Sequence, residues 1–412
     1  MIKFPLAYTN IIFFVMIFFL PSFGYVALNS SSLALGFLVS LLLIWIFSFD
    51  KFIHLKLSKN LKIISILFAI HTSFIIFFGN NFDLAKAIPS IILIVFVILS
   101  ALLFSQKLEK IDDLLFINII KICTIIILSL GIFSLLFEFN FLGYSEYEKS
   151  IFPFAEPRHF VTSTGSFILT SSLYLSKNKK IFLGILMPLF IFVFQSVVLI
   201  FFFLMFLFFV FLLDIKKQFF NVFFIFIITL SIFSLIGDSD YFSSRLDFSS
   251  QNTNLTVLVF LQGWDEMFHS IRLTDGFGVG FQNMGNLPPS PISKLIKSLS
   301  GGFYMNRNDG AFLASKIISE FGFLGIFFVL LYLKAFFRSL FFLINMILKN
   351  KNPLKRFNKR SLVVFAHMNI VFLIIEVFAA GTGYFTTGVF LFIMSLIILE
   401  NDSKQKITRF HE

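Results

Sequence analysis

The chain is a succession of long apolar stretches separated by short polar segments. These stretches are continuous rather than alternating, and most have the length of about 17–25 residues that an α-helix needs to cross a bilayer. A backbone inside hydrocarbon must satisfy its own hydrogen bonds, so the pattern predicts helices. Twelve spans are expected, at residues 6–24, 33–49, 61–79, 87–105, 115–137, 158–175, 181–195, 197–213, 219–236, 311–333, 361–379 and 383–399.

The stretch from 181 to 213 is the hardest to divide. At a rise of ~1.5 Å per residue it is too long for one upright helix and short for two. Polar Gln195 and Ser196 lie near its middle, so we place a boundary between two helices there.

Composition agrees with this pattern, because 58% of the 412 residues are hydrophobic and only 13% are charged. The expected fold class is an all-α, polytopic integral membrane protein. Its expected organisation is membrane helices 1–9 in residues 1–236, one large outer loop in 237–310, and helices 10–12 with a tail in 311–412. The single cysteine, Cys123, excludes an intrachain disulfide.

The net charge of +11 could indicate a nucleic-acid partner, but its distribution indicates membrane topology instead. If both termini are cytoplasmic, 24 of the 33 lysines and arginines fall in cytoplasmic segments, as the positive-inside rule requires. The first stretch has no convincing small-residue cleavage site, so we interpret it as a span rather than a signal peptide.

This topology makes a direct prediction. A reporter fused at residue 290 should be outside the cell membrane, and one fused at residue 355 should be cytoplasmic. Compartment-specific reporter activity measures both positions, and finding them on one side would contradict every outer-face assignment below.

One polar cluster stands out at the predicted outer end of the sixth span. The segment "FPFAEPRHF", residues 152–160, places Glu156, Arg158 and His159 around a proline that fixes the first turn of the helix. In such a cluster, the acid can accept a proton from a hydroxyl, and the basic groups can bind pyrophosphate.

Arginines on the outer face are unusual in a positive-inside protein. The guanidinium group is a planar fork of donors that matches phosphate oxygens, which points to an anionic ligand such as pyrophosphate. Lipid headgroups or nearby aspartates are the alternative partners. The outer arginines are Arg158, Arg245, Arg272 and Arg307.

Within the outer loop, "LTVLVFLQGWDEMFHSIR" at 255–272 has a helical period. Its polar face is expected to carry Gln262, Asp265, Glu266, His269 and Arg272, opposite a face with Trp264, Phe268 and other apolar residues. Such a helix should lie on the outer leaflet, either as the floor of a lipid-substrate site or as a plain amphipathic lid. Asp265 and His269, four apart, form either a general-base pair or an ordinary helix-surface pair.

Two further segments of the loop could bind phosphate. In "DGFGVG", residues 275–280, Gly276, Gly278 and Gly280 would let backbone N–H groups approach an anion, although a flexible connector has the same pattern. Asn308 or Asp309 is expected to cap the tenth span, and the more specific alternative is a phosphate site beside the cap.

Other polar groups within spans are mostly expected to be structural. Lys316 and Glu320, at i and i+4, should pair with each other, whereas Glu376 has no obvious partner and is a weak functional candidate. The acidic "DSD" at 238–240 is interpreted as a hydrophilic helix end, and no persuasive metal cluster is found, so no metal and no cofactor are expected.

Taken together, "FAEPRHF", "RLTDGFGVGF" and "NDGAFLASKIISEFGFLGI" resemble segments of the O-antigen polymerases, the Wzy-type proteins of the O-antigen ligase-like superfamily. The overall layout of spans around one large outer loop is similar along nearly the whole chain. Polymerases often have Glu-Pro-Ser where this chain has Glu156-Pro157-Arg158, so Arg158 is a candidate phosphate binder on its own chemistry rather than a site carried over from the family. Ligases typically have a histidine near the loop's end, where this chain has Asn308-Asp309.

The resemblance implies a metal-independent glycosyltransferase of the bacterial inner membrane that faces the periplasm. It would move a growing glycan from undecaprenyl pyrophosphate onto a lipid-linked repeat unit. Glu156, His159, His269 and Asp309 are the candidate catalytic residues, and the arginines and loop glycines are the candidate ligands of pyrophosphate and glycan. Membrane lipid, a chain-length regulator and a flippase are candidate partners, and nucleic acid is not expected.

Two rivals stay open at this stage. A ligase of the same superfamily would use similar chemistry, whereas a lipid-linked oligosaccharide flippase would need a polar path at mid-membrane and has little use for a long outer loop. A non-catalytic scaffold would tolerate replacement of each outer arginine.

Overall fold

The fold is taken from a computed structural model of the whole chain. It describes residues 6–30, 32–46, 59–79, 82–137, 143–144, 147, 149–236, 244–245, 247, 253–349, 361–381 and 383–411. The "DSD" segment and the reporter position 355 lie outside these residues. Helices dominate the described residues, which contain no strand beyond an isolated bridge between Ile151 and Phe154.

The helices follow the apolar stretches of the sequence. In chain order they are α1 (Leu6–Ala27), α2 (Ala34–Ile46), α3 (Lys59–Phe78), α4 (Leu84–Leu108), α5 (Asp113–Leu136), α6 (Pro157–Leu173), α7 (Lys177–Phe194), α8 (Val197–Val210), η3 (Leu212–Asp214), α9 (Ile215–Ile236), α11 (Leu255–Leu273), α12 (Pro291–Leu299), α13 (Leu313–Lys349), α15 (Ser361–Phe372), α16 (Ile374–Phe378) and α17 (Thr387–His411).

Each of the twelve predicted stretches contains helix, but the number of spans is not confirmed. Among the described residues, six helical segments are long and apolar enough to cross a membrane. Two further apolar helices, Ala34–Ile46 and Val197–Val210, are shorter. The structure therefore supports a helical membrane protein without fixing twelve crossings.

The boundary predicted at Gln195 and Ser196 is confirmed. Gln195 ends α7 in the left-handed region at φ 43°, and Ser196 is the extended residue before α8. Gln195 then accepts a hydrogen bond of 2.6 Å from the Lys149 ammonium, which gives its amide a polar partner at the break.

Two other span predictions are corrected. The tenth helix does not end near residue 333 but continues to Lys349, because no glycine or proline interrupts 326–349. The eleventh is not one helix, since α15 ends at Phe372 and the short α16 follows from Ile374.

The helices around α6 form the centre of the bundle. α6 packs against α5, α8 and α15, and α15 packs against α13 and α17. Interlocking rings fill this centre; for example, Phe167 of α6 lies edge-on to Phe14, Phe18 and Phe365. Gly165 gives the Phe372 ring space against α6, where any Cβ would collide with it.

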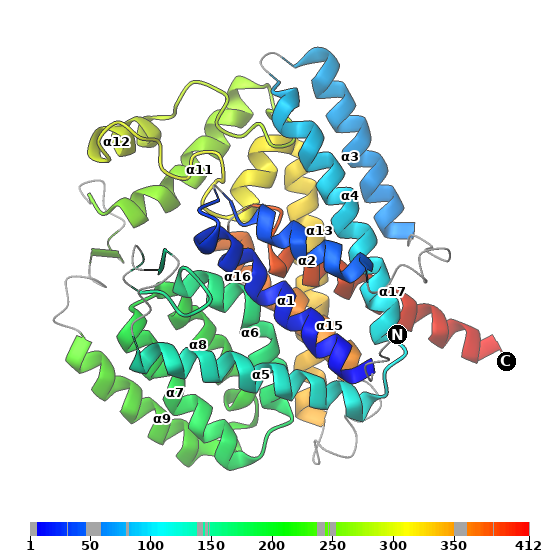
Figure 1. The fold of residues 1–412 in the computed structure, drawn as a ribbon, viewed down its shortest axis with the longest axis vertical. Helices are drawn as coiled ribbons and strands as arrows, with labels where there is room; N and C mark the ends of the chain where they lie inside the picture. The colour runs from blue at the N-terminus through cyan, green and yellow to red at the C-terminus, as the bar shows by residue number, and fades with distance from the viewer. Residues whose placement is uncertain are drawn as a thin grey trace.

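The outer loop packs onto one side of this bundle. In Figure 1, α11 and α12 lie at the upper left, away from the start of α1 and the end of α17. α11 contacts both α12 and α13. The loop is therefore seated on α13 rather than free of the bundle.

The expected faces of α11 are wrong in part. Gln262 and Glu266, assigned to the solvated face, are buried, whereas Phe268 is 59% exposed. The reason is that polar groups of the loop, contributed by residues beyond α11, give Gln262 and Glu266 hydrogen-bond partners. The periodicity of α11 alone does not reveal partners that come from other segments.

Candidate functional site

The cluster at the start of α6 is built by a turn that holds its backbone in place. Glu156 is the extended residue before the helix, at φ −136° and ψ 151°, and Pro157 occupies the first turn. The preceding residues are fixed by hydrogen bonds from Ala155 N–H to Ser22 Oγ (2.8 Å) and from the Tyr144 hydroxyl to Pro153 O (2.7 Å). The predicted role of proline at this turn agrees with this geometry.

Glu156 does not cap the helix with its side chain, because it pairs with Arg158. Nε of Arg158 lies 2.6 Å from Oε2, and Nη2 donates to Oε1 at 3.2 Å. Both side chains keep partial exposure, 29% for Arg158 and 37% for Glu156. The fork-to-carboxylate geometry fixes the guanidinium while part of it still faces outward.

Electrostatics keep this carboxyl ionised. Burial alone would raise the pKa of the Glu156 carboxyl, but the charge of Arg158, the hydrogen bond from its guanidinium and the charge of Arg245 outweigh burial and hold that pKa below its ordinary value. The structure thus brings Glu156, Arg158 and His159 together, and the charge of Arg245 acts on the Glu156 carboxyl. A carboxylate of lowered pKa is a weak base.

His159 differs from its neighbours in the cluster. It is only 6% exposed, and neither ring nitrogen has a hydrogen-bond partner. The ring lies edge-on to Tyr25 at 6.4 Å between centroids. It lines a pocket together with Pro21, Ser22, Leu33, Thr162, Ser163, Thr386 and Thr387. An imidazole with two unsatisfied nitrogens facing a pocket is placed to exchange a proton with a bound hydroxyl or water.

Arg307 takes a role that differs from its predicted one. Its Nε lies 2.9 Å from Oε1 of Glu266, and the pair is almost fully buried, with exposures of 9% and 1%. A second nitrogen, Nη2, donates to Leu287 O at 2.5 Å. These contacts leave little of the fork for pyrophosphate.

Glu266 is the hub of the outer loop. Its Oε1 accepts from Ser290 N–H at 3.1 Å and from the Ser293 hydroxyl at 2.5 Å, as well as from Arg307. Burial would raise the pKa of the Glu266 carboxyl, but the hydrogen bonds from Arg307, Ser293 and Ser290 outweigh it and lower that pKa. The hub joins α11 to α12 and to the segment before α13.

The remaining predicted residues of the loop are not drawn into one site. Asp265 accepts from Ile292 N–H at 3.0 Å, and His269 Nε2 lies 3.1 Å from Pro288 O, so the two do not form the expected pair. The side chains of Arg272 and Asp309 are exposed. Arg272 makes no hydrogen bond or ion pair with any described residue, so its guanidinium is open to a ligand.

Capping of α13 by Asn308 or Asp309 is not observed. The helix begins only at Leu313, because the chain turns at Gly310, and the Ser315 hydroxyl donates to Gly310 O. Asn308 contributes its carbonyl instead, which accepts from the Lys316 ammonium at 2.6 Å.

The glycine loop is neither a flexible connector nor an open phosphate cradle. Its N–H groups already have acceptors: Gly276 donates to Ile271 O (2.9 Å), Gly278 to Thr274 Oγ1 (2.9 Å) and Gly280 to Glu320 O (2.8 Å). All three glycines have φ between 82° and 89°. This conformation lets the loop backbone pack closely against α13 at the point where that helix is broken.

The break in α13 explains this use of glycine. Gly322 lies inside the helix at φ 56° and ψ −131°, which interrupts the hydrogen-bond ladder. Val279 N–H donates to the freed Ser319 carbonyl at 3.0 Å, and Phe323 N–H donates to Gly276 O at 2.8 Å. The loop backbone thereby satisfies groups that the broken helix leaves open.

The predicted Lys316–Glu320 pair is confirmed. Nζ lies 3.3 Å from Oε1, with exposures of 3% and 0%. Tyr384, from the segment before α17, donates to Oε2 of Glu320 at 2.7 Å. This buried group links α13 to the segment before α17. Its partners all lie within the protein, which favours a structural role.

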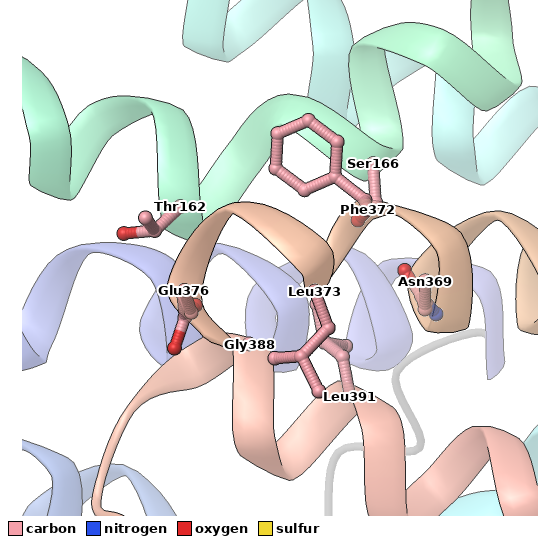
Figure 2. A pocket seen from close by; sticks show the side chains of 8 residues that line it. All are labelled: Thr162, Ser166, Asn369, Phe372, Leu373, Glu376, Gly388 and Leu391. Atoms are coloured by element: carbon pink, nitrogen blue, oxygen red, sulfur yellow. The ribbon is translucent and has the colours of Figure 1, made fainter. Parts of the chain in front are cut away.

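Glu376 has a partner that sequence reasoning missed. It is 3% exposed, and its Oε2 accepts from the Thr386 hydroxyl at 2.7 Å. Figure 2 shows that it faces a pocket lined by Thr162, Ser166, Asn369, Phe372, Leu373, Gly388 and Leu391. Thr162 lines this pocket and the one at His159 alike, so the two adjoin. The run of serines and threonines in α6, "TSTGS" at 162–166, was the available signal.

A ligand set for a metal is not found in the described part of the chain, where no three His, Cys, Asp or Glu side chains gather. Comparison with protein-family models, with curated proteins and with solved structures finds no match for this chain.

Proposed function

We propose that the protein is a polysaccharide polymerase of the O-antigen or capsule type in the bacterial inner membrane. It transfers a growing glycan from undecaprenyl pyrophosphate onto a lipid-linked repeat unit at the periplasmic face. One observation carries the proposal: a fixed arginine–carboxylate pair at the start of α6 is followed directly by a buried, unpartnered histidine that lines a pocket.

The reaction needs a base for the acceptor and positive charge for the leaving group. The acceptor hydroxyl attacks the anomeric carbon of the donor, a C–O bond forms, and the bond to the pyrophosphate oxygen breaks. His159 accepts the hydroxyl proton, since its nitrogens have no other partner. The negative charge that develops on pyrophosphate is stabilised by Arg158, with Arg245 as a further contact.

Glu156 supports this arrangement rather than acting as the base. Its carboxylate is already engaged by two contacts with Arg158, and these contacts orient the guanidinium. Partial exposure of that pair leaves donors for a phosphate to reach. In the proposal Glu156 is thus a positioning residue for Arg158.

The outer loop has a defined shape of its own. Its α11–α12 unit is held together by the Glu266 contacts and seated on α13 through the glycine loop. In the proposal this loop is a rigid part of the periplasmic face.

The pocket at mid-bundle favours a second candidate, a lipid-linked oligosaccharide flippase. Polar residues inside a bundle are characteristic of transport paths. Against it, the pocket is small, with room for about one water molecule at each end. That space admits no sugar without rearrangement of α6 or α17, and an acceptor sugar needs a similar rearrangement to reach His159.

The proposal predicts activity with simple components. Purified protein given undecaprenyl-pyrophosphate-linked repeat units, excess chelator and no nucleotide sugar should produce a ladder of longer lipid-linked glycans, because the chain offers arginines for the leaving group. Gel separation of the products measures the ladder. Folded protein that makes no ladder but moves the same lipid across liposome membranes would identify a flippase, and transfer to lipid A acceptors alone would identify a ligase.

A further inference from the structure

The pocket between α6, α15–α16 and α17 carries unsatisfied polar groups that the proposed reaction does not use. The Asn369 side chain is 4% exposed, and its Oδ1 has no hydrogen-bond partner, although its amide nitrogen donates to Ser395 at 3.1 Å. Figure 2 shows Asn369 on the same pocket as Glu376 and Thr162. A buried carbonyl oxygen without a donor indicates a missing donor in the pocket.

A second pocket adjoins it toward the start of α6. Thr162 belongs to it and to the pocket of His159, whose two ring nitrogens are also without partners. Each pocket has room for about one water molecule and offers two or more polar atoms to it, which is what a buried water requires. In space, polar groups thus follow one another from His159 to Thr162 and then to Glu376.

The backbone around Glu376 supports a hydrated site. Helix α15 ends at Phe372, α16 covers only Ile374–Phe378, and the chain does not become helical again until Thr387. Non-helical backbone at membrane depth is tolerated where it is buried in protein or lines a water-filled cavity. Glu376 lies beside this break, with a threonine as its partner and no cation among the residues that line its pocket.

We propose that this pocket is a proton-binding site, in which an ordered water links Glu376 to Asn369 and Thr162, and a second water continues to His159. A proton enters on water at the His159 end and forms an O–H bond with the Glu376 carboxylate, which becomes a neutral acid. The same path returns it, so charge and atoms balance without any co-reactant. The inference does not depend on the polymerase reaction.

Other charged groups near Glu376 are accounted for. From α13, Tyr332 faces it, but the Tyr332 hydroxyl donates to Ile370 O at 3.2 Å. Lys316 and Glu320 of α13 pair with each other. The start of α17 presents only uncharged residues to the pocket, and Glu156 and Arg158, at the start of α6, pair with each other.

Infrared spectroscopy of the full-length protein in lipid nanodiscs tests the site without any substrate. The wild type should show a band of a protonated carboxylic acid that titrates with pH and shifts promptly in D₂O under native conditions. The band should be lost in Glu376→Gln, moved in Asn369→Leu, and retained in Glu320→Gln, the matched buried carboxyl. Melting and gel filtration confirm that each variant is folded.

Three results would overturn the proposal. A band lost only in Glu320→Gln assigns the proton to the α13 pair, and a band that shifts in D₂O only on unfolding shows a sealed pocket without water. A response to Na⁺ at constant pH shows a metal-cation site instead. The ladder assay reports separately on the polymerase proposal, so failure of one is distinguishable from failure of the other.

Discussion

Replacing Arg307 by alanine is expected to release the outer loop from the bundle. The change leaves the Glu266 carboxylate buried without its charge partner, which costs about 3–5 kcal/mol for pairs of this kind. Hydrogen exchange should therefore increase across α11, α12 and the segment between them, and glycan synthesis should fall with it. Acidification should loosen the same region, because a carboxyl of lowered pKa contributes its stability at neutral pH and loses it as the pH falls below the ordinary value of 4.5.

A second replacement separates a structural role from ligand binding. If Arg307 acts through Glu266, the double variant Glu266→Met with Arg307→Met should regain much of the exchange protection and the activity, since an apolar pair can fill the place of a buried ion pair. Arg272→Ala is the matched control: this arginine is exposed and pairs with no residue that the structure describes, so the loop should stay protected. A protected loop together with lost activity in Arg307→Ala would show that Arg307 contacts substrate after all.

His159→Gln is expected to lower kcat by about 10²–10⁴-fold, the usual contribution of a general base. Glutamine preserves the size and burial of the side chain but cannot accept and pass on a proton in the same way. Glu156→Gln should instead raise KM more than it lowers kcat, because it weakens the hold on Arg158 and so weakens pyrophosphate binding. Kinetics with purified protein and a range of lipid substrate concentrations separate the two effects.

The chain offers a matched control for this test. His367 is also buried, at 7% exposure, but its Nδ1 lies 3.0 Å from Ser339 Oγ and its ring stacks on Phe342, away from the polar pockets. His367→Gln should therefore affect stability without a selective loss of kcat. If His159→Gln keeps nearly full kcat and Glu156→Gln abolishes it, the carboxylate is the base.

Features that depend on local sequence were predictable. The apolar runs gave the helices, polar Gln195 and Ser196 gave the boundary between α7 and α8, and the i, i+4 spacing gave the Lys316–Glu320 pair. Pro157 similarly placed the start of α6 at the outer cluster. Each of these is set by residues within about one turn of helix, so sequence patterns suffice.

Features that depend on distant residues were not predictable. Glu266 was assigned to a solvated face because its partners, Ser290, Ser293 and Arg307, are between 24 and 41 residues away. The glycine loop was assigned to phosphate because its acceptors on α13 become available only where Gly322 breaks the helix. A sequence pattern gives the conformational freedom of a segment, but tertiary contacts decide what that freedom is used for.

The candidate site lies between these cases. The sequence identified Glu156, Arg158 and His159 as a group but left the base undecided between Glu156 and His159. The proposal assigns the base to His159, because the ion pair with Arg158 engages the carboxylate, whereas the imidazole has no partner and lines a pocket. The residues that complete the two pockets, such as Asn369 of α15 and Thr386 just before α17, come from segments more than 200 positions further along the chain.

The most direct test of the proposed reaction is its stoichiometry. Purified protein in liposomes would be given lipid-linked repeat units that carry separate labels in the sugar and in the carrier pyrophosphate. The proposal predicts that one undecaprenyl pyrophosphate is freed for every repeat unit joined, with the growing chain always attached to the most recently added carrier. Freed carrier without chain growth, or movement of intact lipid across the membrane without any freed carrier, would contradict it.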